Sequence, residues 1–172
     1  MDPRPKFPVS GSREDTHHQL QTSWENELHR LREIKDDSGT SSGINEGVIE
    51  IVAALNINGI STSASDEGHV ETQGRGDTHY PWILVEARDG EPDKIFELHR
   101  LLLKYLEEFY SDRYTTEDIK LKLDEPRHGQ FTLASVLDED AEAKDAMLEK
   151  LPQRQKEMAD FGRFLKSKFF AG

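Results

Sequence analysis

The sequence predicts an α+β fold, with a four-stranded, mostly antiparallel sheet and helices packed on one face of it. Several segments carry apolar residues at every third or fourth position, which is typical of amphipathic helices. Other segments alternate between apolar and polar residues, and they come in two pairs separated by turn residues. A leucine-rich helical segment lies between the two pairs. We therefore expect two hairpins around a central helix.

Two helices are expected before the first strand. Ser12 is a suitable N-cap for the first, and the apolar stripe that follows it consists of Leu20, Trp24, Leu28, Leu31 and Ile34. The second begins near Ile44, and Asn58-Gly59 is its expected end. Its buried face consists of Ile44, Val48, Ile51, Val52 and Leu55. The richness of this face in isoleucine and valine indicates deep burial.

The first hairpin is expected from residue 60 onward. Residues 60–70 form a weak strand pattern, because serine and threonine dominate it, and residues 71–79 contain the glycines of a loop. Residues 82–87 give the strongest strand pattern. Pro81 is tolerated there because it lies at the end of the ladder. Asp89-Gly90 is the expected turn after this strand.

The central helix is expected to begin at Pro92, which suits a first helical turn. Its apolar face consists of Ile95, Leu98, Leu102, Tyr105, Leu106 and Phe109, and it is widened by Leu101 and Leu103. Residues 119–124 then alternate as a half-buried strand, residues 126–129 form a turn, and residues 131–135 form its partner strand.

Asp138 is a suitable N-cap for a fourth helix, and Pro152 either interrupts this helix or starts a fifth. The last apolar stripe consists of Met158, Phe161, Leu165 and Phe169. From the combined pattern we predict that four leucines are nearly inaccessible to solvent. They are Leu55, Leu84, Leu102 and Leu106.

The chain length of 172 residues fits one domain. We expect residues 1–12, which contain three prolines, to be a disordered tail. Residues 13–172 are expected to form a single α+β domain. Within this domain, residues 36–43 are polar and rich in serine and glycine, and we expect them to be a flexible linker.

The charge and cysteine content limit the classes of function. The formal net charge of −12 repels phosphate backbones, so no nucleic-acid partner is expected. The same charge suits basic partners or metal ions, or it serves only solubility. The chain has no cysteine, which excludes thiolate zinc sites and cysteine nucleophiles and fits the reducing cytoplasm. We find no secretory signal and no apolar run of membrane-spanning length, so we expect a soluble protein without a membrane partner.

One polar segment and the residue expected across its hairpin carry the strongest candidate site. Its members are Ser65, Asp66, Glu67, His69, Glu71 and His79. On a strand, residues 67, 69 and 71 share one face, and carboxylates with imidazole suit a divalent metal or acid–base chemistry. The alternative is a solvated strand face with Gly68 at a bulge.

This segment also resembles small uncharacterised bacterial and phage proteins. The resemblance covers residues 59–69 and Tyr80-Pro81-Trp82-Ile83, and it rests on a Ser-Cys-x-Gly-His motif of that family. Ser65, Gly68 and His69 match the motif, whereas Asp66 stands in the place of the cysteine. The resemblance implies a shared local role of Ser65 and His69, with the hydroxyl fixing the imidazole tautomer. It also implies that any function of the cysteine is lost or changed here.

Two functions are compatible with these patterns. The first is a non-catalytic binding or interaction module, because the chain has no catalytic motif and has apolar helices. The leucine-rich central helix would then contact a protein partner or a second copy of the chain, unless it is buried in the monomer. The alternative is a small metal-assisted hydrolase centred on residues 66–71. The sequence indicates no particular cofactor and does not decide whether the protein is an enzyme.

Overall fold

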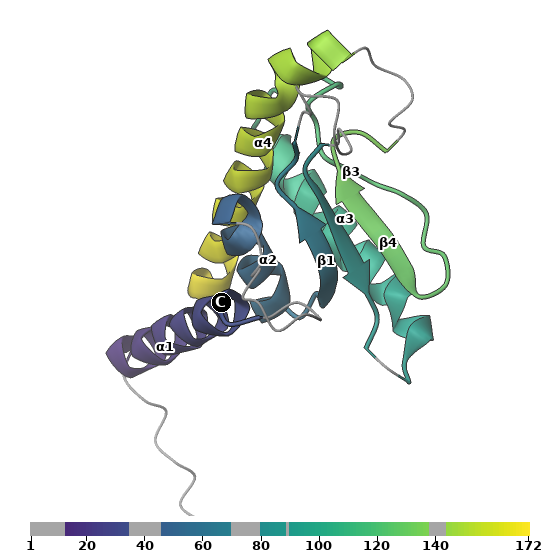
Figure 1. Cartoon of the computed structure of the whole chain (residues 1–172). Coiled ribbons are helices and arrows are strands. Elements are labelled where there is room, and N and C mark those ends of the chain that lie inside the picture. Colours follow the sequence, from purple (N-terminus) through teal and green to yellow (C-terminus); the bar gives the residue numbers. More distant parts are fainter. Residues whose placement is uncertain (1–12, 35–45, 70–79, 89, 138–143) are drawn as a thin grey trace, which may run out of the picture.

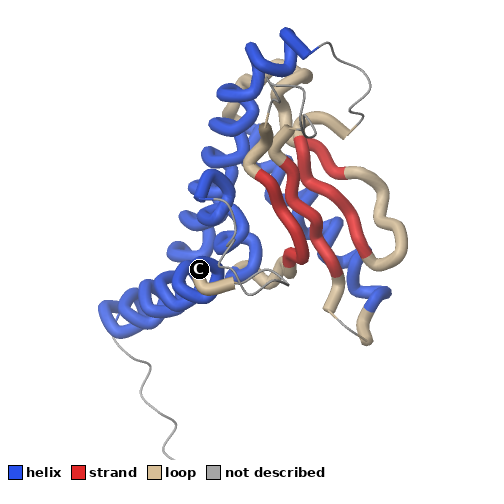
Figure 2. Tube along the Cα trace, in the orientation of Figure 1, coloured by secondary structure: helices blue, strands red, loops and turns tan. Residues whose placement is uncertain are grey.

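The structure is a computed structural model, and it describes residues 13–34, 46–69, 80–88, 90–137 and 144–172. It confirms the α+β class and the open four-stranded sheet (Figure 1, Figure 2). The helices are α1 (Arg13–Arg32), α2 (Glu46–Ile57), the short 3-10 helix η1 (Pro92–Lys94), α3 (Ile95–Ser111) and α4 (Lys144–Ala171). The strands are β1 (Thr62–Asp66), β2 (Trp82–Glu86), β3 (Lys122–Leu123) and β4 (Gln130–Ala134). The expectations for residues 1–12, 36–43, 71–79 and Asp138 fall outside the described residues.

The sheet has the order β1-β2-β4-β3, and each neighbouring pair is antiparallel. The β1–β2 and β3–β4 pairs are the two predicted hairpins, and α3 connects them. The two hairpins join through β2 and β4, where Ile83 lies opposite Leu133 and Val85 lies opposite Phe131. The strands β1 and β3 are therefore the two edges of the sheet.

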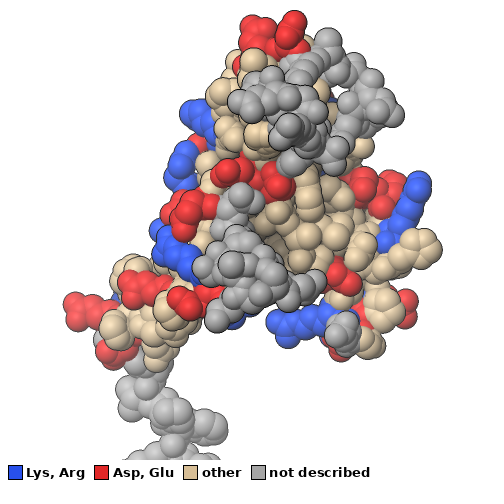
Figure 3. All heavy atoms as spheres, viewed as in Figure 1, with Lys and Arg blue, Asp and Glu red and all other residues tan. Residues whose placement is uncertain are grey.

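Only one face of the sheet is covered by helices. Ile83, Val85, Phe131 and Leu133 are buried on that face, within one apolar cluster that also includes residues of all four α-helices. No described helix covers the opposite face, and Figure 3 shows an area of uncharged atoms in the middle of it. Leu84 lies on this second face and is half-exposed, so the prediction that it is inaccessible was wrong. Successive residues of a strand point to opposite faces of the sheet. Because Ile83 and Val85 of β2 point into the core, Leu84 between them points away from it.

The other three predicted core leucines are buried. Leu55, Leu102 and Leu106 have exposed fractions of 0%, 0% and 4%. Leu55 belongs to α2. Seven of the eight residues from Val48 to Leu55 are buried in this helix, as its isoleucine and valine content predicted. Leu102 and Leu106 are one helical turn apart on α3 and face the same core. Residues of α2, α3, α4, β2 and β4 therefore supply the fully buried part of the core.

The C-terminal helix α4 is one continuous helix of 28 residues, so the expected break or new start at Pro152 does not occur. Proline inside a helix removes one main-chain hydrogen bond and costs about 3 kcal/mol. The long packed face that follows offsets this cost, because Met158, Phe161 and Leu165 are all buried. At Gly162 the helix approaches α2 so closely that an added Cβ would lie 2.9 Å from the Cβ of Ile51.

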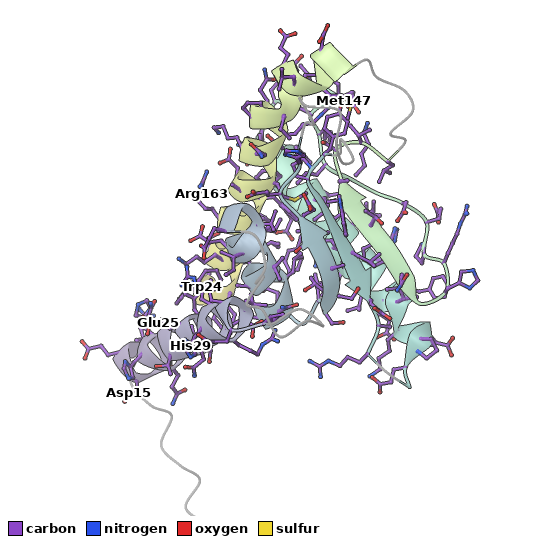
Figure 4. The ribbon with its side chains drawn as sticks, viewed as in Figure 1. Asp15, Trp24, Glu25, His29, Met147 and Arg163 are labelled. Carbon is purple, nitrogen blue, oxygen red and sulfur yellow. The ribbon has the colours of Figure 1, made fainter. Side chains whose placement is uncertain are left out.

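The first helix, α1, packs with a narrow stripe and leaves most of its surface exposed. Trp24 and Leu31 are its buried residues. Figure 4 shows Trp24 where α1 meets α4, and there its ring centroid lies 6.5 Å from that of Phe170. The ammonium of Lys166 lies 4.5 Å above the same indole ring, which adds a cation–π contact. The predicted apolar stripe thus attaches α1 to α2 and to the end of α4.

The second hairpin is shorter than the alternation predicted. Only Lys122–Leu123 forms β3, because the chain before it turns: the N–H groups of Ile119 and Lys120 both donate to the carbonyl of Thr116, at 3.0 Å. The tight turn of this hairpin has positive φ at His128 (53°) and Gly129 (74°). A two-residue turn with positive φ at both positions has a backbone twist that matches the twist of the flanking antiparallel strands. This turn leads directly into β4.

Candidate functional site

The structure describes four of the six predicted site residues. Ser65 and Asp66 end β1, Glu67 follows the strand, and His69 is exposed in an isolated β-bridge. Glu71 and His79 lie outside the described residues. The strand ends at Asp66, so strand alternation does not place Glu67 and His69 on a common face. No group of three potential metal-binding side chains occurs among the residues that the structure describes.

A hydrogen bond of Asp66 stabilises a turn. Its Oδ1 accepts a hydrogen bond from the N–H of Gly68 at 2.8 Å, which is the pattern of an Asx-turn. Gly68 has a φ of +87°, and an added Cβ would lie 2.7 Å from Cδ of Pro81 and 2.8 Å from Cδ1 of Leu151. Both the conformation and the lack of space require glycine at this position.

Glu67 joins the end of β1 to two helices. Its Oε2 accepts a hydrogen bond from the N–H of Gly47 at 3.2 Å, in the first turn of α2. A carboxylate there satisfies a free amide and complements the helix dipole. The carbonyl of Glu67 accepts a second hydrogen bond, at 2.9 Å, from Nε2 of Gln155 on α4. The described contacts of Asp66 and Glu67 thus give this acidic segment a structural role.

A hydrophobic groove lies between α3 and β3, and we call it the α3–β3 groove. Its volume is about 270 Å³. The residues that line it are Leu103, Leu106, Glu107, Tyr110, Lys120, Leu121, Lys122 and Leu123. Leu103 has an exposed fraction of 42%, whereas its helical neighbours Leu102 and Leu106 are buried. One leucine of the predicted apolar face therefore points out of the core, toward an edge strand.

Two hydrogen bonds hold this edge strand against the helix. The N–H of Leu121 donates to the hydroxyl oxygen of Tyr110 at 2.8 Å. Further along, Nε2 of His99 lies 3.1 Å from the carbonyl oxygen of Asp124, and the His99 ring contacts Phe131 edge-on. The contacts fix β3 relative to α3 at two separate points. The groove is consequently a preformed feature of the fold.

The rim of the groove carries more positive than negative charge. Lys122 is exposed, and the ammonium of Lys120 lies 4.9 Å above the ring of Tyr110. Lys120 also lies 3.9 Å from the carboxylate of Glu117, a long ion pair. Across the groove, Glu107 is exposed on α3. Of the groove-lining residues, two are thus cationic and one is anionic, although the whole chain has a net charge of −12.

Polar contacts beneath the groove bind it to α4. The hydroxyl of Tyr110 donates to Oε1 of Glu157 at 3.1 Å, and Arg113 donates to both oxygens of the same carboxylate. Burial raises the pKa of Tyr110 above its ordinary value. The hydrogen bonds to Glu157 raise the pKa of Arg113 above its usual range. At neutral pH both groups keep their protons and act as hydrogen-bond donors in this network.

Some of this site was visible in the sequence. The widened apolar face of the central helix included Leu103, and the alternation at residues 119–124 placed Leu121 and Leu123 on one side. The contact between Tyr110, Arg113 and Glu157 was missed, because it joins residues more than 40 positions apart. An excess of apolar positions around the helix was the available signal, since it indicated an interface or deep burial.

Comparisons with known proteins add no family to these observations. No protein-family model, no curated protein and no solved structure matches the chain. Within the described residues, no helix is long and apolar enough to cross a membrane.

Proposed function

We propose that this protein is a non-catalytic interaction module that binds an extended segment of a protein partner in the α3–β3 groove. The observation that carries the proposal is the position of Leu103. It is 42% exposed, and it lies in a groove whose other side is an edge strand. Exposed apolar side chains at a preformed groove are typical anchors for a partner.

The groove suits an extended peptide because of its two walls. Among the strands that the structure describes, β3 pairs with β4 alone, so its other edge is available for main-chain hydrogen bonds from an added strand. Alternate side chains of such a strand would point into the groove, against Leu103, Leu121 and Leu123. This arrangement of an edge strand beside a helix is a recurring way to bind peptides by strand addition.

The charges at the rim favour an acidic segment. Lys120 and Lys122 flank the apolar lining, and a peptide with carboxylates between its apolar residues would pair with them. The overall negative charge opposes such a partner at long range, but salt screens that repulsion beyond about 8 Å. A second copy of the chain suits the groove less well. Twofold pairing of two β3 edges would place the same lysines against one another.

A binding assay with full-length protein tests the proposal. The probe is a short capped peptide of alternating leucine and glutamate, and a peptide of alternating leucine and lysine is its control. We expect saturable fluorescence anisotropy with the acidic peptide, and we expect Leu103→Glu to weaken this binding at least tenfold. Leu148→Glu is the matched variant, because Leu148 is an exposed leucine on α4, and it should bind as the wild type does.

Two results would overturn the proposal. One is equal binding of the acidic peptide by wild type and Leu103→Glu. The other is concentration-dependent dimerisation in sedimentation that Leu103→Glu abolishes, since a second copy would then occupy the groove.

The contacts of Asp66 with Gly68 and of Glu67 with Gly47 are those of a turn and a helix start. They favour an interaction module over a metal-assisted hydrolase centred on this segment.

A further inference from the structure

A second region of the surface is independent of the α3–β3 groove. A polar cavity of about 320 Å³ lies where α1, the end of α2 and the start of β1 meet. The residues that line it are Glu27, Arg30, Asn56, Ser61, Thr62 and Arg88. Ser61 and Arg88 also line a neighbouring cavity with an apolar part formed by Ala87 and Leu98. The volume is at the lower end of the range for small-molecule sites.

A hydrogen-bonded network holds one wall of this cavity in place. The side chain of Arg30 donates to both oxygens of Glu27, and Nδ2 of Asn56 donates to Oε1 of Glu27 at 2.9 Å. Oδ1 of Asn56 accepts hydrogen bonds from the N–H and the hydroxyl of Thr62, at 3.1 and 3.0 Å. Hydrogen bonding to Arg30 lowers the pKa of Glu27, so this carboxylate stays charged. The wall is therefore prearranged.

Arg88 differs from the other charged residues of the cavity. Among the residues that the structure describes, no carboxylate is paired with its guanidinium. The nearby Glu91 is paired with Lys94 at 3.1 Å instead. The guanidinium has five N–H donors in a planar fork that matches a carboxylate or a phosphate. Within the described part of the chain, the guanidinium of Arg88 is thus available to an anion, and Arg88 lines the cavity.

We propose that this cavity binds a small molecule that carries a carboxylate group, with Arg88 as its main anchor. The charge balance favours a carboxylate over a phosphate. Arg30 and Arg88 contribute two positive charges and Glu27 one negative charge, so the lining has a net charge of +1. That charge is balanced by a monoanion, whereas a dianionic phosphate would leave the occupied cavity with a net charge of −1. The apolar surface of Ala87 and Leu98 then contacts the remainder of the molecule.

Nuclear magnetic resonance of the side-chain Nε–H groups of arginine tests this site in the full chain. The probe is propionate, titrated at constant ionic strength against sodium chloride. We expect a saturable shift of the Arg88 signal. Arg100, an exposed arginine on α3, is the internal control and should not show a saturable shift. The variants Arg88→Gln and Asn56→Asp should each weaken binding roughly tenfold, because one removes the anchor and the other adds a negative charge.

Three results would overturn the site. They are a linear response of Arg88 without saturation, an equal response of Arg88 and Arg100, and saturation by inorganic phosphate at lower concentration than by propionate. The variant Arg100→Gln should keep propionate binding unchanged, and its loss would equally contradict the assignment. None of these results depends on the α3–β3 groove, so the two proposals succeed or fail separately.

Discussion

The carboxylate of Glu157 on α4 accepts two hydrogen bonds from Arg113, at 3.0 Å from Nε and 2.8 Å from Nη2. Glu157 is buried, with an exposed fraction of 4%, and Arg113 lies just after the end of α3. The same carboxylate accepts a hydrogen bond from Tyr110, whose oxygen in turn holds Leu121 beside the groove. This pair thus connects α4 to the segment that lines the α3–β3 groove.

Replacing Glu157 with alanine should lower the free energy of unfolding by about 2–3 kcal/mol, measured by urea denaturation. Breaking a buried ion pair leaves the other charge without its partner. The loss is smaller than for a fully buried pair, because Arg113 is partly exposed and keeps a second contact with Asp160 at 2.8 Å. Glu149→Ala removes an exposed carboxylate from the same helix and should change stability by less than about 0.5 kcal/mol. Equal effects of the two substitutions would show that the pair does not anchor the groove.

Tyr110 should make the protein less stable at high pH. Its pKa is raised by burial above the ordinary value of 10.0, so the unfolded chain releases this proton first as the pH rises. Stability from this group is therefore complete below pH 10 and is lost above it. We expect a smaller decline in the free energy of unfolding above this pH in Tyr110→Phe than in wild type.

The fully exposed Tyr114 provides the control for this pH experiment, with an exposed fraction of 93%. The free energy of unfolding of Tyr114→Phe should decline at high pH as steeply as that of the wild type. A decline in Tyr110→Phe as steep as in wild type would mean that Tyr110 ionises equally well in both states.

Two leucines that the sequence pattern assigned to the core should differ strongly in their effect on stability. Leu102→Ala should cost about 2–5 kcal/mol, because Leu102 is completely buried in the core. Leu84→Ala should cost less than about 1.5 kcal/mol, because its side chain lies half-exposed on the open face of the sheet. Urea denaturation of both variants checks this order, and a larger cost at Leu84 would mean that the open face is covered in solution.

The sequence could not distinguish these two leucines for a physical reason. Alternation shows that Ile83 and Val85 share one face and Leu84 lies on the other, but all three are apolar. Tertiary packing decides which face is buried, because Ile83 and Val85 join one apolar cluster with residues of all four α-helices. The helices were easier to predict, because their apolar stripes have polar residues on the other side. The predicted interruption at Pro152 was wrong because the packing of the long helix α4 offsets the cost of a proline inside it.

The predicted site was only partly accessible to sequence reasoning, for a similar reason. Asp66 and Gly68 make a local turn that their spacing allows, since the acceptor and donor are two residues apart. Glu67 contacts Gly47, which is 20 residues away in the sequence. A carboxylate beside a histidine suggests metal chemistry, and nothing local reveals that it lies at the start of a helix. The pairing of Arg113 with Glu157 depends on tertiary structure in the same way.

Glu67 should contribute to stability through α2. Glu67→Ala removes the acceptor for the N–H of Gly47, and we expect a loss of about 0.5–2 kcal/mol. Glu50→Ala is the matched control, because Glu50 is exposed on the same helix. Zinc titration by calorimetry completes the test. Zinc binding that disappears in Glu67→Ala, without a loss of stability, would favour the metal site over the structural role.

The most direct test of the α3–β3 groove as a binding site is a methyl NMR titration of leucine-labelled full-length protein with the capped leucine–glutamate peptide. Our account predicts saturable shifts of the methyl groups of Leu103, Leu121 and Leu123, which line the groove, and unchanged signals from Leu148 on α4 and Leu84 on the open face of the sheet. Shifts at Leu84 with unchanged groove signals, or no saturable shift at any leucine, would contradict it.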